Sequence, residues 1–135
     1  LPLPVYGDGM NVRDWIHVED HCRGLLAALE RGRSGEVYNL GGENEQHNID
    51  VIRMMLQMMN KPESLLRRVA DRPGHDRRYS LDVRKLCALG WEPGHTFEEA
   101  LEKTVKWYVE NEWWWRKIKS GEYLEFYRRW YGERL

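Results

Sequence analysis

The stretch "LPVYGDGMNVRDWIHVEDH", residues 3–21, predicts a strand, a glycine turn, a second strand and the start of a helix. Leu3–Tyr6 is short and carries prolines, which cannot donate to a strand ladder and therefore favour an edge position. The "GDG" at residues 7–9 is typical of a turn. Residues 12–18 alternate enough to predict a second strand before the helical pattern begins.

The helical pattern "HVEDHCRGLLAALERG", residues 17–32, predicts an amphipathic helix that ends at Gly32. Its apolar positions recur at i, i+3, i+4 and i+7, so we expect one buried stripe formed by Cys22, Leu25, Leu26 and Leu29. Cys22 and Cys87 are the only cysteines, and neither belongs to a CxxC pair. We expect both to be buried, reduced thiols of a cytoplasmic protein.

The remainder of the chain predicts further alternation of strands and helices. Asn48 is expected to cap a helix whose apolar face is Ile52, Met55, Leu56 and Met59. Thr96 and Glu99 have the spacing of a capping box. The other expected elements are strands at 36–42 and 66–70, a short helix at 82–89, a helix with apolar residues from 101 to 109, and two final helical pieces broken near 120–121. The predicted class is mixed α/β, with residues 1–135 forming one domain.

The composition excludes some classes of protein. The 135 residues include 21 basic and 22 acidic ones, giving a formal net charge of -1. A nucleic-acid binder normally has a large basic excess, so no nucleic-acid partner is expected and any anion site must be a local cluster. No apolar run approaches the length of a membrane span. The chain has no initiating Met and begins inside an expected strand, so we expect a piece of a longer protein.

The stretch "DRPGHDRRY", residues 71–79, concentrates cations around a Pro-Gly bend. Arg72 lies in it, and Arg13 follows the "GDG" turn. A guanidinium fork suits phosphate oxygens, and both arginines lie on connections where ligand contacts concentrate. From spacing alone, ion pairs of Arg13 with Asp14, and of Arg72 with Asp71 or Asp76, are favoured over a phosphate site.

The histidines give no clear prediction. His75 could donate to a phosphate or sugar hydroxyl, or could be tied to a backbone carbonyl. His17, His21, His47 and His95 show no metal-ligand spacing, and we expect no metal. The run Trp113–Trp115 cannot occupy one helix face, so at least one of these rings must meet solvent or a partner.

Several catalytic motifs are absent from the sequence. There is no G-x-G-x-x-G fingerprint, no P-loop, no nucleophile elbow and no Tyr-x-x-x-Lys pair. The chain therefore offers a possible anion pocket without visible reaction machinery, and we expect no catalytic residue in it.

Five segments together resemble the C-terminal part of the dTDP-glucose 4,6-dehydratase family, within the extended short-chain dehydrogenase/reductase superfamily. They are "LPVYGDGMNVRDWIHVEDH", "GEVYNLGGENEQHNID", "DRPGHDRRYSLD", "LGWEP" and "TFEEALEKTVKWYVEN". The first is shared widely among nucleotide-sugar epimerases and dehydratases, whereas "DRPGHDRRY" is much narrower. The resemblance implies the small substrate-binding lobe of a Rossmann-type nucleotide-sugar enzyme, without the Rossmann lobe that binds NAD and carries out catalysis.

The resemblance also implies which residues contact a dTDP-sugar. Pro4, Val5 and Tyr6 would lie against the nucleotide, and Arg13 and Arg72 would hold the diphosphate. Asn48 and His75 would contact the phosphates and nucleoside, and Tyr131 matches a more variable family position near the ligand. The partners implied are dTDP-glucose or dTDP and the Rossmann lobe, with no cofactor in this chain itself.

Two rival interpretations remain open. One is the corresponding lobe of another nucleotide-sugar epimerase or decarboxylase. The other is a free-standing, non-catalytic nucleotide-sugar-binding module. If the chain is an isolated lobe, the surface that faces the absent part should be unusually apolar, and self-association is expected.

Overall fold

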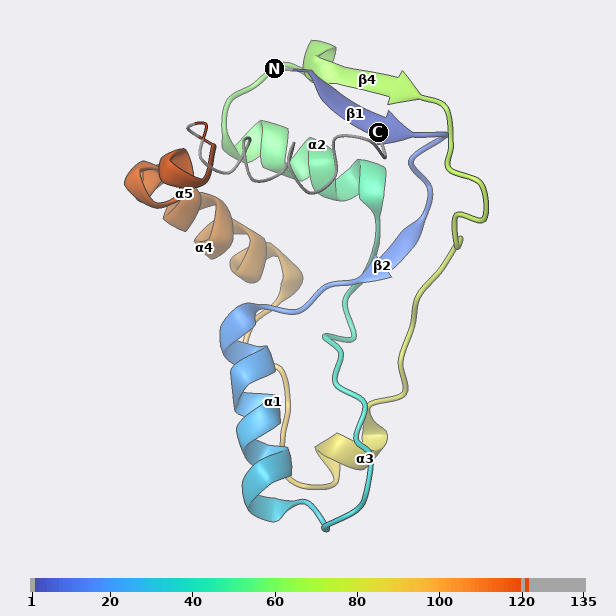
Figure 1. The fold of residues 1–135 in the computed structure, drawn as a ribbon, viewed down its shortest axis with the longest axis vertical. Coiled ribbons are helices and arrows are strands. Elements are labelled where there is room, and N and C mark those ends of the chain that lie inside the picture. The colour runs from blue at the N-terminus through green and yellow to red at the C-terminus, as the bar shows by residue number, and fades with distance from the viewer. Residues whose placement is uncertain (1, 120, 122–135) are drawn as a thin grey trace. The chain divides into compact units, whose positions relative to one another are not determined.

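The computed structural model describes residues 2–119 and 121, and the chain divides into two compact units, Leu1–Glu102 and Lys103–Leu135. The mixed α/β class is confirmed. The elements, shown in Figure 1, are β1 (Leu3–Tyr6), β2 (Val12–Asp14), α1 (Val18–Arg31), β3 (Glu45–His47), α2 (Asn48–Met58), a 3-10 turn (Glu63–Leu65), β4 (Leu66–Val69), α3 (Arg84–Cys87), α4 (Phe97–Glu110) and α5 (Glu112–Lys119).

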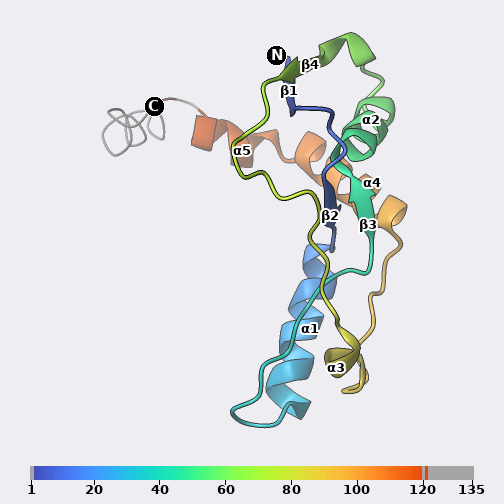
Figure 2. The same cartoon turned by 90° about the vertical axis from the view of Figure 1, so that its right-hand side faces the viewer.

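Two small sheets organise the first unit. β1 and β4 pair in parallel, with Leu3 opposite Leu66 and Tyr6 opposite Val69. β2 and β3 pair antiparallel, with Val12 opposite His47. Figures 1 and 2 both show β1 and β4 side by side. The strands predicted at 3–6 and 66–70 are thus confirmed, the latter one residue shorter.

The strand predicted at residues 12–18 is too long, because β2 ends at Asp14. The Asp14 carboxylate accepts from the backbone N–H groups of Gly42 (2.9 Å) and Asn44 (2.8 Å), which fixes the chain where the ladder stops. Three residues later His17 takes the N-cap position of α1. Hydrogen bonds to the Asp14 side chain therefore hold the chain where the alternating pattern had predicted continued strand pairing.

The strand predicted at residues 36–42 is wrong. Among the described residues no strand pairs with this segment, and side chains satisfy part of its backbone instead. Lys85 Nζ donates to the Val37 carbonyl at 2.8 Å, for example. The β-rich sequence of this segment therefore has no ladder to join within the described part of the chain.

The helix predicted at residues 17–32 is confirmed as α1, but its buried face is not the expected one. Gly24 and Ala27 are buried, while Leu25, Leu26 and Leu29 are exposed, Leu29 by 83%. A Cβ at Gly24 would meet Leu40 Cδ1 at 2.5 Å, so neighbouring groups approach this side of the helix closely.

Neither cysteine is fully buried: Cys22 is exposed and Cys87 is half-buried, which corrects the expectation of two buried thiols. The small residues of α1 face the core instead. Ala27 packs with Leu86 and Trp91 to form a core cluster. Figure 2 shows α1 and α3 lying close together at this end of the first unit.

The second predicted helix, α2, begins at Asn48, the residue that was expected to be its N-cap. His47 is the N-cap of α2 without a side-chain capping bond, so the prediction that Asn48 caps the helix is wrong. The Asn48 backbone N–H donates to the Asn11 carbonyl at 3.0 Å. The helix buries Ile49, Val51 and Leu56, whereas Met59, expected on the buried face, is 44% exposed.

The features predicted for residues 96–115 agree better with the structure. The capping box is confirmed: the Thr96 N–H donates to Glu99 Oε2 at 3.0 Å, and the Glu99 N–H donates to Thr96 Oγ1 at 3.3 Å. In the second unit Trp113 is 61% exposed, as expected for one of three consecutive rings. The last predicted helical piece lies outside the described residues.

The bend at residues 71–79 is joined to β2 and β3 by backbone and ionic bonds. The Val12 N–H donates to the Arg77 carbonyl (2.8 Å), and the Tyr79 N–H donates to the Val12 carbonyl (3.2 Å). Arg78 makes two hydrogen bonds of 2.6 Å to the carboxylate of Glu45. These bonds from Arg78, with one from Ser80, hold the pKa of Glu45 at about 2.

Replacing Leu86 tests the core. Leu86 is 0% exposed, so Leu86→Ala should lower the free energy of unfolding by about 2–5 kcal/mol through lost burial and a cavity. The matched change Leu29→Ala, on the exposed face of α1, should have a much smaller effect. Urea unfolding followed by circular dichroism measures both, and equal losses would contradict this assignment of the buried face.

Acid should weaken the link between β3 and the bend. The folded pKa of Glu45 is below its ordinary value of 4.5, so the ionised carboxylate stabilises the fold. That stabilisation is complete above the ordinary pKa and is lost as the pH falls towards 2. Glu45→Gln should therefore show a smaller loss of stability between pH 6 and pH 3 than the unchanged chain, measured by urea unfolding. Glu30→Gln, on α1, should behave as the unchanged chain; identical pH profiles for all three would refute the link.

Candidate functional site

A cavity of about 530 Å³ lies in the first unit, between the ends of β1 and β2, the start of α2 and the bend. This volume falls within the range of small-molecule sites. The structure brings seven of the eight residues proposed from the sequence into its lining: Pro4, Val5, Tyr6, Arg13, Asn48, Arg72 and His75. Tyr131 lies outside the described residues.

The strand pairings explain why these residues meet. Because β1 and β4 run parallel, Tyr6 and Val69 end at the same edge, and the Gly7 N–H donates to the Val69 carbonyl at 3.0 Å. The chain leaving β4 therefore enters the bend beside Tyr6. This is the edge at which ligands bind in open parallel sheets.

The turn between β1 and β2 brings the start of α2 to the same place. Gly9 has φ +73°, and an added Cβ would lie 2.9 Å from both Val5 Cγ1 and Ile49 Cβ. Its carbonyl accepts from the Ile49 N–H at 3.0 Å. Only glycine fits this left-handed, crowded position without strain. The glycine turn thus holds Asn48, the residue before Ile49, next to the cavity.

The arginines of the bend and of β2 fall into two groups. Arg77 donates to both carboxylate oxygens of Asp8 (2.8 and 3.0 Å), and Arg78 is paired with Glu45. Among residues 2–119 and 121, Arg13 and Arg72 form no ion pair, so the alternative that they pair with Asp14, Asp71 or Asp76 is wrong. The two arginines that line the cavity are the ones whose charge no described carboxylate neutralises.

Neutral groups hold Arg13 and Arg72 instead. Arg13 donates to the carbonyls of Val12 (2.7 Å) and Asp76 (3.0 Å), and its guanidinium lies 4.3 Å from the centre of the Tyr79 ring. The Arg72 guanidinium lies 5.4 Å from the centre of the Tyr6 ring. Carbonyl and aromatic partners orient a cation without cancelling its charge. The cavity therefore presents two positive forks to an anion.

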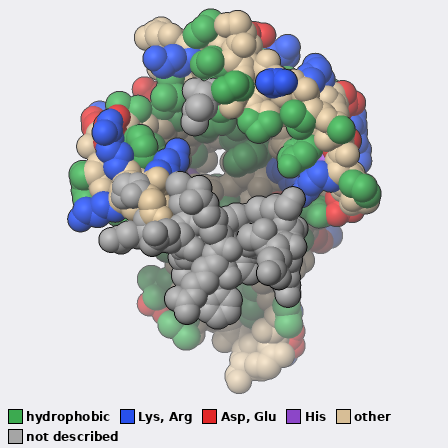
Figure 3. Space-filling view, turned by 45° about the horizontal axis from the view of Figure 1, so that its top comes forward, with side chains coloured by type: hydrophobic (Ala, Val, Ile, Leu, Met, Phe, Trp, Pro, Cys, Tyr) green, Lys and Arg blue, Asp and Glu red, His purple; other side chains and the backbone are tan. Residues whose placement is uncertain are grey.

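One face of the molecule shows mixed surface charges. In the face shown in Figure 3, lysine and arginine side chains are interspersed with hydrophobic ones rather than gathered in one broad patch. This agrees with the nearly balanced composition. The capacity for an anion is thus a local property of the cavity.

His75 is held by an acidic neighbour. Its Nδ1 lies 2.6 Å from Asp71 Oδ1, and its side chain is only 5% exposed. The hydrogen bond from His75, together with that from the Arg72 N–H, lowers the pKa of Asp71 below its ordinary value. An ionised carboxylate only accepts, so Nδ1 carries the proton and the ring is fixed in orientation. The sequence left this partner open between a ligand and a backbone carbonyl.

The sequence did not single out Asn11 as a site residue. Asn11 is 2% exposed and lines the cavity, and its Nδ2 donates to the Asp76 carbonyl at 3.1 Å. Its Oδ1 is buried without a partner among the described residues. The one sequence signal that could have indicated Asn11 is its position in "GMNVRD", as a polar residue directly before the predicted second strand. Trp15, Ile52 and Met55 supply apolar lining that the sequence had assigned to strand or helix packing.

The side chains that could bind a metal ion lie outside this cavity. Among the described residues, one group of three could hold an ion: His17, Glu19 and His95. The ring centres of His17 and His95 lie 4.5 Å apart.

Within the described part of the chain, no helix is both long and apolar enough to cross a bilayer.

Comparison with known proteins places this architecture in a family. The family model described as GDP-mannose 4,6 dehydratase matches residues 1–104. The chain is 47% identical over 132 residues to the dTDP-glucose 4,6-dehydratase of Xanthomonas campestris pv. campestris, covering 90% of this chain and 38% of that protein. It is 44% identical to the Escherichia coli enzyme of the same name, covering 98% and 38%. The chain thus spans little more than a third of the length of these relatives.

Solved structures agree with the sequence matches. A dTDP-glucose 4,6-dehydratase from Bacillus anthracis in complex with NAD matches with a TM-score of 0.81 and 47% identity, covering 87% of this chain and 37% of that one. A UDP-glucose 4-epimerase from Thermotoga maritima with UDP-glucose matches with a TM-score of 0.75 and 30% identity, covering 81% and 35%. The resemblance inferred from the sequence is confirmed. Since the family model covers more than half of the chain, the chain belongs to the GDP-mannose 4,6 dehydratase family.

Proposed function

We propose that this chain is the nucleotide-sugar-binding part of a dTDP-glucose 4,6-dehydratase, an enzyme that converts dTDP-glucose to dTDP-4-keto-6-deoxyglucose in the cytoplasm. The observation that carries the proposal is the cavity in which Arg13 and Arg72, without a described carboxylate partner, lie together. Relatives at 44–47% identity that are named dTDP-glucose 4,6-dehydratase support the choice of reaction.

In this proposal the two guanidinium forks hold the diphosphate, since each offers paired donors to phosphate oxygens. Asn48 and His75 contact the phosphates and nucleoside. The nucleotide lies against Pro4, Val5 and Tyr6, with Tyr131 near the ligand. The seven cavity residues come from four separate segments, so the site depends on the fold and not on one local motif.

The chemistry of the whole enzyme would be oxidation at sugar C4, loss of water across C5 and C6, and return of the hydride from bound NAD. This chain lacks a glycine-rich dinucleotide loop, so NAD and the catalytic residues are assigned to a part of the protein outside it. The role of residues 1–135 is to fix the nucleotide and thereby orient the hexose. Binding energy from these remote groups can be used for positioning at the reacting carbon atoms.

The exposed apolar side of α1 supports the proposal that a separate cofactor-binding lobe packs against this chain. Val18, Leu25 and Leu29 are 67%, 56% and 83% exposed, and Val37, after the helix, is 78% exposed. Exposed apolar residues clustered on one element are typical of an interface. We assign the cofactor-binding lobe as the occupant of this face, because the relatives are much longer than this chain.

The isolated chain should associate through this face. Leu25→Glu combined with Leu29→Glu should shift it towards the monomer, because two charges would have to be buried on association. Analytical ultracentrifugation over a concentration series measures the change, with Glu30→Gln as the control that leaves association unaltered. A chain that stays monomeric throughout the series would contradict the expected self-association.

Nucleotide titration tests the proposed function. Arg72→Ala should weaken dTDP binding by about tenfold to a hundredfold, because a charge-assisted hydrogen bond is worth about 1.5–3 kcal/mol. Arg84→Ala removes an equal charge, but Arg84 is paired with Asp82 and does not line the cavity, so binding should be unchanged. Isothermal titration calorimetry provides the affinities.

Three outcomes of nucleotide titration and of an activity assay would refute parts of the proposal. A tenfold preference for UDP over dTDP would favour the corresponding lobe of a UDP-sugar epimerase. Formation of 4-keto-6-deoxyglucose by this chain alone would show that the catalytic residues are not in a separate part. Equal loss of dTDP affinity in the Arg72→Ala and Arg84→Ala variants would remove the cavity as the binding site.

A further inference from the structure

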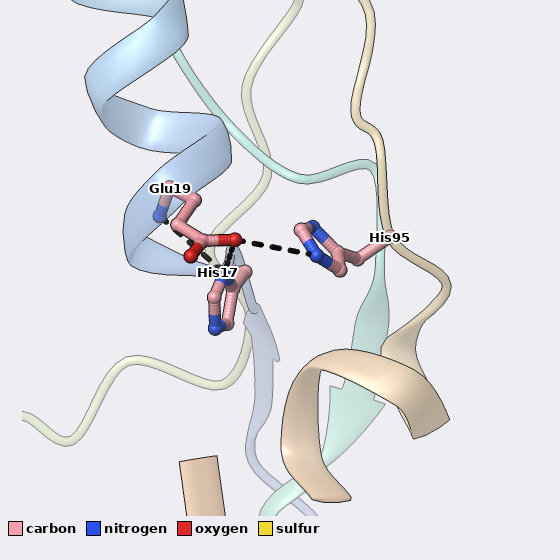
Figure 4. Close-up of side chains that lie close together, drawn as sticks. All are labelled: His17, Glu19 and His95. Carbon is pink, nitrogen blue, oxygen red and sulfur yellow. Dashed lines mark hydrogen bonds and ion pairs between the residues drawn. The ribbon is translucent and has the colours of Figure 1, made fainter. Parts of the chain in front are cut away.

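A second polar cluster lies outside the cavity, where the start of α1 meets the loop before α4. It consists of His17 at the N-cap of α1, Glu19 in its first turn and His95 in the loop. Figure 4 shows the Glu19 carboxylate close to both imidazoles, with His17 below it and His95 to its right in this view. All three belong to the first unit, and the proposed nucleotide site does not use them.

The spacing of the three side chains suits a small divalent cation. Glu19 Oε2 lies 3.5 Å from His95 Nε2 and 3.7 Å from His17 Nδ1, and all three ligand atoms lie within 4.8 Å of one another. Around tetrahedral zinc, bonds of about 2.0–2.1 Å separate neighbouring ligand atoms by about 3.3 Å. Small side-chain rotations would therefore complete the geometry.

His95 is already oriented as a ligand. Its Nδ1 lies 2.9 Å from Asp20 Oδ2, and the Asp20 side chain is only 2% exposed. Asp20 is fixed in turn by the Gly94 N–H (3.1 Å) and by an ion pair with Arg23 (2.9 Å). With Nδ1 donating to this carboxylate, the remaining nitrogen, Nε2, is the one on the side of Glu19. A carboxylate behind an imidazole is the arrangement commonly found behind histidine ligands of zinc.

His17 offers a lone pair on the same side. Its Nδ1 accepts a long bond of 3.4 Å from the Glu19 N–H, so this nitrogen is unprotonated in that interaction. The imidazole is 8% exposed, whereas the Glu19 side chain is 60% exposed. A cation would replace one weak hydrogen bond at His17, and the Glu19 carboxylate can adjust from the solvent side.

We propose that His17, Glu19 and His95 bind a zinc ion, which joins the start of α1 to the loop before α4. Two imidazole nitrogens and one carboxylate oxygen form a common zinc ligand set, with water at the fourth position. The alternative is a metal-free cluster in which a protonated His95 bridges Asp20 and Glu19. The two differ in whether zinc binds and in whether Glu19 matters for that binding.

The test is a titration of the untagged, EDTA-treated chain with zinc chloride at pH 7.5 by isothermal titration calorimetry. One equivalent is expected to bind, and Glu19→Gln and His95→Gln should each weaken binding at least tenfold. His21→Gln is the matched control, because His21 is exposed on the same helix and outside the cluster; its affinity should be unchanged.

A second measurement uses the unchanged chain, so its result does not depend on whether a variant folds. Cobalt(II) bound to the unchanged chain should give the visible absorption bands of a four-coordinate site, and an excess of zinc should remove them. Circular dichroism checks that Glu19→Gln, at an exposed position, remains folded. Absence of stoichiometric binding, or equal zinc affinity in Glu19→Gln and His21→Gln, would overturn the proposal.

Discussion

The parallel pairing of β1 with β4 is the constraint on which the rest of the first unit depends. Its register sets Tyr6 against Val69, so the chain that leaves β4 can only begin the bend next to the end of β1. A shift of this register would carry Arg72 and His75 away from Tyr6 and would remove the bonds between the bend and β2. One short ladder of two strands thus decides whether distant cations share a cavity.

Within that frame, the arginines differ in their partners: two form ion pairs, and two line the cavity. Arg77 and Arg78 close ion pairs that tie the bend to neighbouring segments. Arg13 is held by carbonyl oxygens and lies over a tyrosine ring, and Arg72 lies near another such ring. The four side chains are chemically identical and close in sequence or space, yet only two of them remain unneutralised by the described carboxylates.

The sequence predicted the elements whose signals are local. The Thr96–Glu99 capping box and the strand Leu3–Tyr6 were found because a few neighbouring residues suffice to specify them. It failed where the partner of a segment decides the outcome. The leucine stripe of α1 has the helical period, but the core of the described residues contacts the small residues Gly24 and Ala27, so periodicity did not reveal that this part of the chain leaves the stripe exposed.

The same distinction applies to the candidate sites. Motif resemblance gave seven lining residues of the cavity, because the family pattern already encodes which distant segments meet. Asn11 was missed, since its importance comes from burial beside the bend and not from its own type. The approach of His17 to His95 could not be predicted, because no spacing rule joins residues so far apart in the sequence.

The attachment of Arg13 to uncharged oxygens has a kinetic consequence. A positive charge that is fixed in place but not cancelled extends its field into the opening of the cavity. A small dianion would be drawn towards that opening before any contact is made. Added salt would then slow its capture more than its release, because screening acts on the approach through water and less on bonds already formed.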